Sequence, residues 1–260
     1  MSVKLLQITD CHLGAREGDC LLGLNPDLSL QYVLEKMWSE HDSADLLVCS
    51  GDLSNEAGVT AYHRLIGQLP REILQAWLPG NHDDNEQMLQ VIGGNRLFLP
   101  SLTFGKWQVT LLDSSIPGRV PGLLGEAELE RAVAVLEEHP DKFHLVFLHH
   151  HLVPVGCRWL DTQVVKNGPE VLEIFSRYPN MRLAVCGHVH QDTCQEHGHV
   201  SLYSTPSTCI QFKRNSDGFA VSDEMPGYRW IELMDDGSFR TGVSRIAARD
   251  LGINLQSSGY

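Results

Sequence analysis

The chain has 260 residues, of which 42% are hydrophobic and 20% charged, and its formal net charge at pH 7 is −13. This length and composition are typical of a globular protein that can bury a large core. The negative charge argues against a surface that holds a nucleic acid polymer. A small phosphate substrate stays compatible with it, because bound divalent metals can reverse the local field. No apolar run approaches the about 20 residues of a membrane-spanning helix, so we expect no membrane partner.

Cysteine usage indicates the cellular compartment. The chain has 7 cysteines, an odd number, and no C-x-x-C pair, which favours free thiols in a reducing compartment. The first residues also lack the long apolar segment and cleavage site of a signal peptide. We therefore expect a cytoplasmic protein, while the sequence leaves its oligomeric state open.

Short apolar runs alternate with helical patterns through residues 1–199. Strands are predicted at 3–9, 44–50, 73–78, 107–113, 143–148 and 181–186. Helices are predicted at 28–41, 61–69, 125–139 and 169–178. Such alternation implies crossover connections and a largely parallel sheet, the arrangement of an α/β fold.

The pattern changes near residue 200. Consecutive strands are predicted at 200–206, 208–212, 218–222, 227–234 and 238–246, with tight turns at "SDG" and "DDG". We expect residues 200–246 to complete a second, mostly antiparallel sheet packed on the first. Residues 247–260 form a polar tail without a predicted element, and the whole chain, 1–260, is expected to be one domain.

Five polar clusters each follow a predicted strand: Asp10 and His12, Gly51 and Asp52, Asn81 to Asp83, His149 to His151, and His188 and His190. The carboxyl ends of strands in an open α/β sheet share one edge, so these clusters should converge. Carboxylate, imidazole and amide groups suit borderline and hard divalent metals. In two clusters the pair is spaced i and i+2, and an extended backbone would turn both side chains to one face.

Each cluster alone has a simpler explanation. A D-x-H pair is usually a surface or capping pair, "GD" is a common turn, and "HVH" suits an exposed strand edge. Their joint occurrence, each directly after a buried strand, argues against coincidence.

The motifs "DCH", "GDL", "GNHD", "LHHH" and "GHVH" together resemble those of the calcineurin-like metallophosphoesterases. The stretches "ITDCHLG", "LHHHLVPVGCRWLD", "CGHVHQ", "TPSTCIQF" and "PGYRW" further resemble the bacterial class III cyclic-AMP phosphodiesterases over nearly the whole chain. The resemblance implies a two-sheet β-sandwich flanked by helices, with a dimetal site at the C-terminal ends of strands. Where those proteins often carry a small residue, this chain has Cys11, whose thiol would make the site oxidation-sensitive.

The resemblance implies two metal ions per chain, and sequence does not choose among iron, manganese and zinc. The first ion would be held by Asp10, His12, Asp52 and His190. The second would be held by Asp52, Asn81, His149 and His188. Asp52 would bridge them, because two cations about 3.5–4 Å apart need a shared anion to offset their repulsion. Within the triplet the family pattern favours His149 as the ligand, with His150 and His151 supporting it or lining the pocket.

The implied reaction is hydrolysis of 3′,5′-cyclic AMP to 5′-AMP, with a metal-bridging hydroxide attacking phosphorus in line with O3′. Asp52 and His82 are the expected catalytic residues; His82 would stabilise the phosphate and protonate the leaving oxygen, with Asp83 orienting its ring. The expected contacts to substrate at the metals are His12, Asp52, Asn81, His82 and His190.

Base recognition must lie outside the metal cluster, because metals recognise only the phosphate. Arg158 and Trp159 follow the histidine triplet and offer a cation and a flat apolar face for a purine. Phe212 lies in a second candidate segment, residues 205–212. The alternative is that Trp159 and Phe212 are core residues.

Two other functions compete with this interpretation. One is hydrolysis of another diester or of a nucleotide-lipid pyrophosphate, although no apolar, basic insertion for a lipid is evident. The other is a non-catalytic module. A metal-free interaction module predicts damaged ligand positions, whereas all seven expected ligands are present. A metal-storage or metal-sensing role keeps its ligands, and a turnover assay would separate it from an enzyme.

Overall fold

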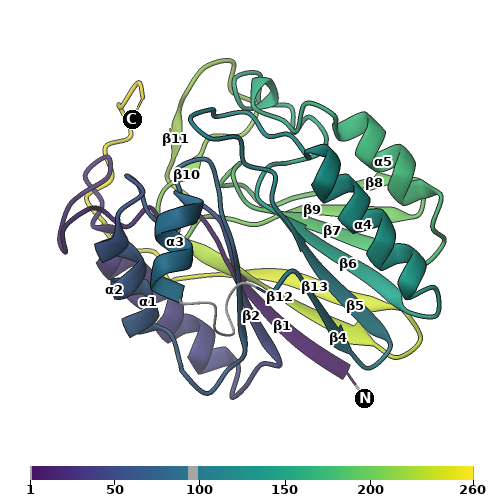
Figure 1. Ribbon diagram of the computed structural model, residues 1–260. Coiled ribbons are helices and arrows are strands. Elements are labelled where there is room, and N and C mark those ends of the chain that lie inside the picture. The colour runs from purple at the N-terminus through teal and green to yellow at the C-terminus, as the bar shows by residue number, and fades with distance from the viewer. Residues whose placement is uncertain (1, 93–98, 260) are drawn as a thin grey trace.

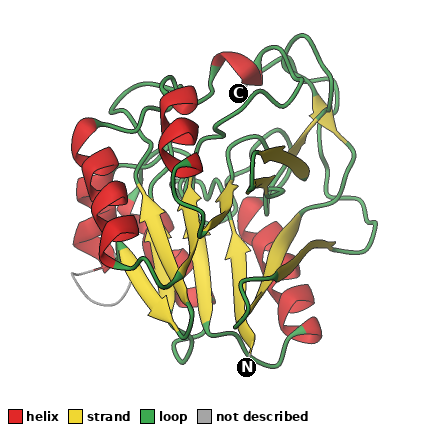
Figure 2. Ribbon diagram, turned by 90° about the vertical axis from the view of Figure 1, so that its right-hand side faces the viewer, coloured by secondary structure: helices red, strands yellow, loops and turns green. Residues whose placement is uncertain are grey.

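Two β-sheets pack face to face, with helices on both outer sides, in the computed structural model, which describes residues 2–92 and 99–259 (Figure 1). The first side carries α1 (Pro26–Glu40), α2 (Val59–Gln68) and α3 (Asn85–Ile92), and the second carries α4 (Glu126–Glu138) and α5 (Gly168–Ser176). Figure 2 shows the layers from the side. The predicted two-sheet sandwich flanked by helices is confirmed.

Each sheet contains a block of parallel strands. The first sheet has the order β13 (Phe239–Arg245), β12 (Gly227–Met234), β1 (Ser2–Ile8), β2 (Leu46–Ser50) and β3 (Gln75–Leu78). The second has the order β4 (Ser101–Phe104), β5 (Trp107–Leu112), β6 (Phe143–Leu148), β7 (Met181–Cys186), β9 (Val200–Ser204) and β8 (Thr193–His197). Strands β1 to β3 run parallel, as do β5, β6, β7 and β9. The strands that carry the polar clusters therefore divide between two sheets.

The sequence predicts that residues 200–246 complete a second, mostly antiparallel sheet, and this prediction is wrong. Strand β9 joins the parallel centre of the second sheet, whereas β12 and β13 extend the first sheet antiparallel to β1. Strands β10 (Gln211–Phe212) and β11 (Val221–Ser222) form a separate two-stranded ribbon. Alternation of polar and apolar residues reveals the faces of a strand but not its neighbours, so it could not assign these strands to a sheet.

Helix α1 begins two residues earlier than predicted. The side chain of Asn25 accepts a hydrogen bond from the Leu28 amide at 3.1 Å, and Pro26 occupies the first helical turn. An N-cap asparagine followed by proline is a strong start signal, because the cap satisfies an amide that has no partner within the helix. Helix α3 was not predicted at all.

Three apolar layers hold the sandwich together. Trp107 and Phe147 lie between the two sheets, Tyr62 and Trp77 lie under α1 to α3, and Phe175 lies under α5. Aromatic side chains of this size each bury a large apolar area and dominate core energetics. The sheet edges that carry the polar clusters are therefore rigid platforms. Among the described residues, no helix has the length and apolar character needed to cross a bilayer.

The tail after residue 246 packs on the loop before α1. The Asn254 amide donates to the Leu22 carbonyl at 2.7 Å, and the guanidinium of Arg249 lies 3.9 Å from the centre of the Tyr32 ring. Leu251 packs against two of the apolar clusters. The tail thus supports the loop that follows the D-x-H motif.

Candidate metal centre

Six of the seven predicted ligands converge in buried groups whose ligand atoms lie within 4.8 Å of one another. One group joins Asp10, His12 and His190; another joins Asp10, Asp52 and His149; a third joins His149, His150 and His188. The residues come from loops after strands of both sheets, so the sandwich itself brings them together. The remaining predicted ligand, Asn81, follows Gly80, which packs directly against Asp52.

The backbone at this cluster is strained. Positive φ angles occur at five predicted ligands: Asp10 (54°), His12 (47°), Asp52 (49°), His188 (66°) and His190 (49°). Residues other than glycine adopt this left-handed region at a cost, and such residues gather at functional sites. The expectation that the D-x-H and H-x-H pairs are extended is therefore wrong, although their side chains do converge. Each strand has ended before its motif begins.

The two carboxylates lie between histidines. Asp52 Oδ2 is 3.2 Å from His149 Nε2 and 3.9 Å from His12 Nε2, while its Oδ1 accepts a hydrogen bond from the His82 amide at 2.8 Å. Asp10 Oδ1 is 3.1 Å from His190 Nε2 and 3.9 Å from His149 Nε2. Asp52 thus faces histidines assigned to both predicted metal sites, which is the placement that a bridging ligand requires.

At Asp52 and His149, interactions with neighbouring charges shift the pKa further than burial does. Burial alone would raise the pKa of Asp52, but His149 and His82 hold it well below its usual range. Burial alone would lower the pKa of His149, but the carboxylates of Asp52 and Asp10 raise it to about 9. Two ionised carboxylates in a buried site form a strong cation site.

The contact between His12 and His190 points to a metal ion. His12 Nδ1 lies 3.2 Å from the side-chain oxygen of Asn55, and His190 Nδ1 lies 2.8 Å from the Ile210 carbonyl. Each of the two Nδ1 atoms faces an oxygen acceptor, which favours the tautomer with the ring proton on Nδ1. The two Nε2 atoms face each other at 3.3 Å, and His190 Nε2 also lies 3.1 Å from Asp10 Oδ1. A cation that binds both atoms makes this contact favourable, and second-shell bonds of this kind are usual for metal-ligating histidines.

The histidine triplet divides by hydrogen bonding. His149 donates from Nδ1 to the Ser50 carbonyl at 2.9 Å, so its Nε2 is the ring nitrogen that faces the carboxylates. His150 has both nitrogens engaged, at 2.9 Å from Ser114 Oγ and 2.9 Å from the Val120 carbonyl. His151 stacks on His188 with ring centres 5.7 Å apart. This geometry suits His149 as a ligand and the other two as supporting residues.

Three predicted ligand atoms are buried without a hydrogen-bond partner: His149 Nε2, His188 Nε2 and Asn81 Oδ1. The contact of His149 Nε2 with Asp52 becomes an ion pair only when that histidine is protonated. The raised pKa of His149 lets its Nε2 donate to Asp52, whereas His188 Nε2 and Asn81 Oδ1 stay unpaired; buried polar atoms are normally satisfied, so these two require an explanation. His188 and Asn81 are both assigned to the second metal, and a bound cation would satisfy both atoms.

Asn55, which the sequence interpretation did not single out, orients two histidines at once. Its side chain holds His12, and its backbone carbonyl lies 3.0 Å from His82 Nδ1. Proton transfer by His82 would consequently use Nε2. The expectation that Asp83 orients His82 is wrong, because the Asp83 carboxylate accepts hydrogen bonds elsewhere, from the amides of Gly80, Leu53 and Ser54 and from the Tyr62 hydroxyl. Asp83 ties the "GNHD" loop to the "GDL" loop.

Gly80 offers a sharp test of this packing. A Cβ at position 80 would lie 2.2 Å from Asp52 Oδ1 and 2.5 Å from the Asp52 amide, so Asp52 must shift. We expect Gly80→Ala to lower turnover by about 100-fold or more, since a displacement of about 1 Å at a reacting group has effects of that size. The control is Gly67→Ala in α2, where a Cβ meets nothing within 4 Å. It should leave turnover intact and raise stability by about 0.5–1 kcal/mol. Normal metal content and turnover in Gly80→Ala would contradict the described approach.

The Cys11 thiol does not support the suggested oxidation sensitivity. Its side chain is completely buried, and burial raises its pKa to about 12. A protonated, inaccessible thiol is a poor nucleophile and a poor target for oxidants.

Arg158 and Trp159 lie outside the cluster. The Arg158 side chain is 81% exposed and 4.0 Å from Asp217 at the surface. Trp159 packs edge-on against Phe212 and Phe219, with ring centres 4.9 and 5.3 Å away. Phe212 in turn stacks on His190 at 4.1 Å with an interplanar angle of 15°. Phe212 thus braces a predicted ligand, and a base contact by Trp159 stays a prediction.

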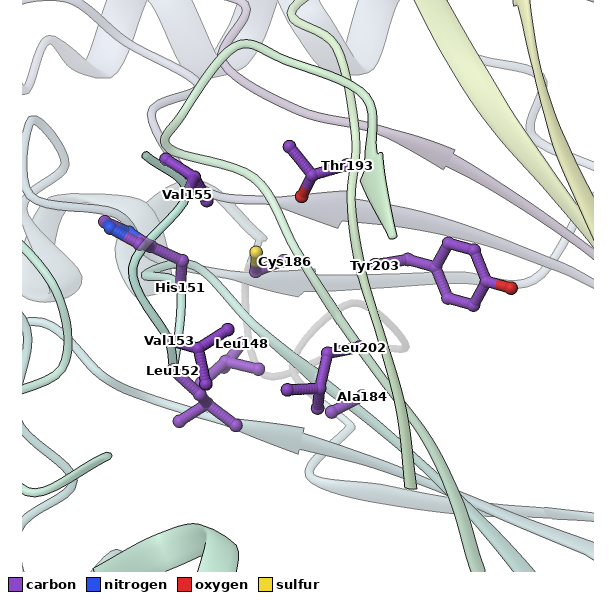
Figure 3. Close-up of a pocket in the computed structure, with 10 residues that line it drawn as sticks. All are labelled: Leu148, His151, Leu152, Val153, Val155, Ala184, Cys186, Thr193, Leu202 and Tyr203. Carbon is purple, nitrogen blue, oxygen red and sulfur yellow. The ribbon is translucent and has the colours of Figure 1, made fainter. Parts of the chain in front are cut away.

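A small cavity lies beside His151, the last residue of the histidine triplet (Figure 3). It is lined mainly by apolar side chains, including Leu148, Val155 and Leu202, with His151 at one side and Cys186 at its centre. Its volume of about 20 Å³ is room for one water molecule, not for a nucleotide. The substrate must therefore approach from another direction.

Comparison with known proteins supports the metal-site interpretation. Residues 3–192 match the model of the calcineurin-like phosphoesterase family. The chain belongs to this family. The fold and cluster agree with the dinuclear metal centre that calcineurin-like phosphoesterases use.

Similar curated phosphoesterases span the whole chain. The chain is 36% identical to the "3′,5′-cyclic adenosine monophosphate phosphodiesterase CpdA" of Pseudomonas aeruginosa, covering 100% of this chain and 96% of that protein. It is 38% identical to the protein of the same name from Vibrio vulnificus, over 100% and 96%, and 37% identical to that of Escherichia coli K12, over 99% and 95%.

Solved structures share the fold at low identity. A dimetal phosphatase from Danio rerio matches with a TM-score of 0.65 at 15% identity, over 94% of this chain and 99% of that one. GAP50, described as the anchor in the inner membrane complex of Plasmodium, matches with 0.67 at 12% identity, over 98% and 90%. The calcineurin-like phosphoesterase fold therefore accompanies different roles, and the residues of the site must decide the function.

Proposed function

We propose that this calcineurin-like phosphoesterase hydrolyses 3′,5′-cyclic AMP to 5′-AMP. The observation that carries the proposal is the buried convergence of Asp10, His12, Asp52, His149, His188 and His190, with ligand atoms that lack a partner. The substrate class rests on the full-length similarity to proteins named cyclic-AMP phosphodiesterases. We further propose that residues 1–260 act as one domain in the cytoplasm.

The proposed ligands divide into two sets that share Asp52. Asp10, His12 and His190 would complete the first set, and Asn81, His149 and His188 would complete the second. When bound, two divalent ions lower the pKa of a coordinated water and polarise phosphoryl oxygens. Their identity among iron, manganese and zinc is open, because each accepts mixed nitrogen and oxygen ligands.

His82 is the proposed proton donor to the departing O3′ oxygen. Its amide is anchored by Asp52 and its Nδ1 by the Asn55 carbonyl, so both the backbone and the ring are fixed next to the cluster. Its ring meets that of His12 edge-on at 4.9 Å between centres. His82 is also partly exposed, so its ring is accessible to a substrate.

Two alternatives differ in what they predict. Hydrolysis of another diester would use the same metals, so only a comparison of substrates separates it from the proposal. A metal-free interaction module does not require buried ligand atoms without a partner. A metal-sensing module does require them, so only turnover separates that role from the proposal.

The experiment is metal analysis of the purified protein, followed by assays with Fe²⁺, Mn²⁺ and Zn²⁺ on cyclic AMP, cyclic GMP and bis(4-nitrophenyl) phosphate. We expect turnover of cyclic AMP with 5′-AMP as the product. A protein that binds two metals and hydrolyses none of these diesters would support the non-catalytic role. Hydrolysis of the aryl diester alone would assign another diester as the substrate.

Trp159→Ala tests the predicted base contact. A base contact would lower kcat/KM for cyclic AMP well beyond that for bis(4-nitrophenyl) phosphate. The packing against Phe212 and Phe219 instead predicts an equal fall on both substrates, with a loss of stability of about 3–5 kcal/mol for a large buried aromatic, and less here because Trp159 is only partly buried. Paired kinetics and thermal unfolding distinguish the two outcomes.

A further inference from the structure

The Thr9 side chain lies against the predicted metal ligand Asp10 and is completely buried. Its hydroxyl oxygen is 2.7 Å from Asp10 Oδ2 and 3.1 Å from the Ser50 carbonyl, and both partners are acceptors. A hydroxyl has a single proton to donate. The Ser50 carbonyl already accepts from His149 Nδ1 at 2.9 Å, and hydrogen bonds to an ionised carboxylate are shorter and stronger than neutral ones. Thr9 therefore donates to Asp10.

The two oxygens of Asp10 have different surroundings. Oδ2 accepts from the Thr9 hydroxyl and from the His188 amide at 3.0 Å. Oδ1 is 3.2 Å from the same amide and faces the histidine rings, at 3.1 Å from His190 Nε2 and 3.9 Å from His149 Nε2. The Thr9 bond is thus the contact that distinguishes the two oxygens, and it leaves Oδ1 as the oxygen turned toward the cluster.

Segments that are distant in the chain hold Thr9 in place. Its carbonyl accepts a hydrogen bond from the Thr208 amide at 3.1 Å. A Cβ at Gly187 would overlap the Thr9 hydroxyl and lie 2.6 Å from Asp10 Oδ2, so any larger residue there would displace the pair. The loop after β7 therefore encloses the hydroxyl and the carboxylate together, and neither can move without the other.

From these contacts we infer that Thr9 is a positioning residue of the first metal site, which sets Asp10 to bind through Oδ1. The inference rests on the proposed function, in which Asp10 holds a metal ion. The terminal torsion of an aspartate side chain is broad, so without the Thr9 donor the carboxylate could present either oxygen. Fixing the carboxylate in advance removes that ordering cost from metal binding.

The test measures the affinity and number of Mn²⁺ ions bound by metal-free wild type, Thr9→Val and Thr9→Ser. Valine has nearly the shape of threonine but no donor, whereas serine keeps the hydroxyl. Loss of a partner that orients a metal ligand typically costs about 10–100-fold in affinity. We expect a loss of that size at one of the two sites in Thr9→Val, and an affinity close to wild type in Thr9→Ser.

The matched control is Thr110→Val in β5. Thr110 is 2% exposed, and its hydroxyl lies 3.4 Å from Ser101 Oγ in β4, so this variant also loses a buried hydroxyl but none that contacts a predicted ligand. Thermal unfolding of the metal-free proteins measures the cost of that loss to stability. Both valine variants are expected to unfold at a lower temperature, whereas only Thr9→Val should lose metal affinity.

If Thr9→Val does not fold, Thr9→Ala removes the same hydroxyl and carries the same expectation. Unchanged Mn²⁺ affinity in the variant without the hydroxyl, or an equal loss in Thr9→Ser, overturns this inference. The proposed function then stands, as long as the wild type binds two ions and hydrolyses cyclic AMP. A wild type that binds no Mn²⁺, Fe²⁺ or Zn²⁺ overturns both.

Discussion

Asp52→Ala is expected to lose both metal ions together and to lower turnover by more than about 100-fold. Loss of a residue that only supports a ligand already costs about 10–100-fold in metal affinity or activity, and Asp52 faces histidines of both sets at 3.2 and 3.9 Å. The measurement is metal content per chain together with turnover of cyclic AMP. The control is Asp141→Ala, because the Asp141 side chain is 69% exposed and lies 3.9 Å from its neighbour Lys142.

Asn81→Ala separates the two sites. Its side-chain oxygen belongs to the second set alone, so this variant should keep the first ion and bind the second more weakly. If Asp52→Ala retained two tightly bound ions and normal turnover, the bridging role would be wrong. If Asn81→Ala lost both ions in parallel, the division into two sets would be wrong.

His82→Ala is expected to bind metal almost normally yet hydrolyse cyclic AMP about 10²–10⁴-fold more slowly, the usual contribution of a general acid. The defect should shrink on bis(4-nitrophenyl) phosphate, because 4-nitrophenolate is a stable leaving group that needs no proton. The comparison uses kcat on both substrates, with His63→Ala as the control, since His63 is an exposed histidine on α2. An equal loss on both substrates would assign His82 to phosphate binding in place of proton donation.

The positions of the motifs could be read from the sequence because they depend on local rules. Apolar runs such as "LLVCS" at β2 and "MRLAVC" at β7 are short, buried and followed by turn residues, and each proved to be a strand. The polar residues come directly after these strands in the chain, so their place at the strand ends could be predicted. Convergence could be inferred because parallel strands present their carboxyl ends on one side.

Other features depend on contacts between distant segments, and no local pattern encodes them. Strand β12 pairs with one edge of β1 while β2 pairs with the other, and the alternation within β12 would be the same in either sheet. The left-handed residues Asp10 and His12 each donate their amide to the loop after β2, to the carbonyls of Gly51 and Asp52. The D-x-H spacing is the same in either conformation.

The supporting residues were the hardest to predict. Asn55 lies three residues after Asp52 in a turn-rich stretch, where an asparagine is ordinary, and only the folded positions of His12 and His82 reveal its role. Asp83 seemed the natural partner of His82 because it is adjacent in sequence. Adjacent side chains seldom share a direction, and Asp83 binds amides of the preceding loop.

We propose that two metals held by the described cluster support the hydrolysis of cyclic AMP. The most direct measurement is a titration of metal-free protein with Mn²⁺, in which bound metal and the rate of 5′-AMP formation are followed in the same samples. We expect a rate that rises with metal occupancy and reaches its plateau at two equivalents per chain. A plateau at one equivalent, or two bound ions without 5′-AMP formation, would contradict it.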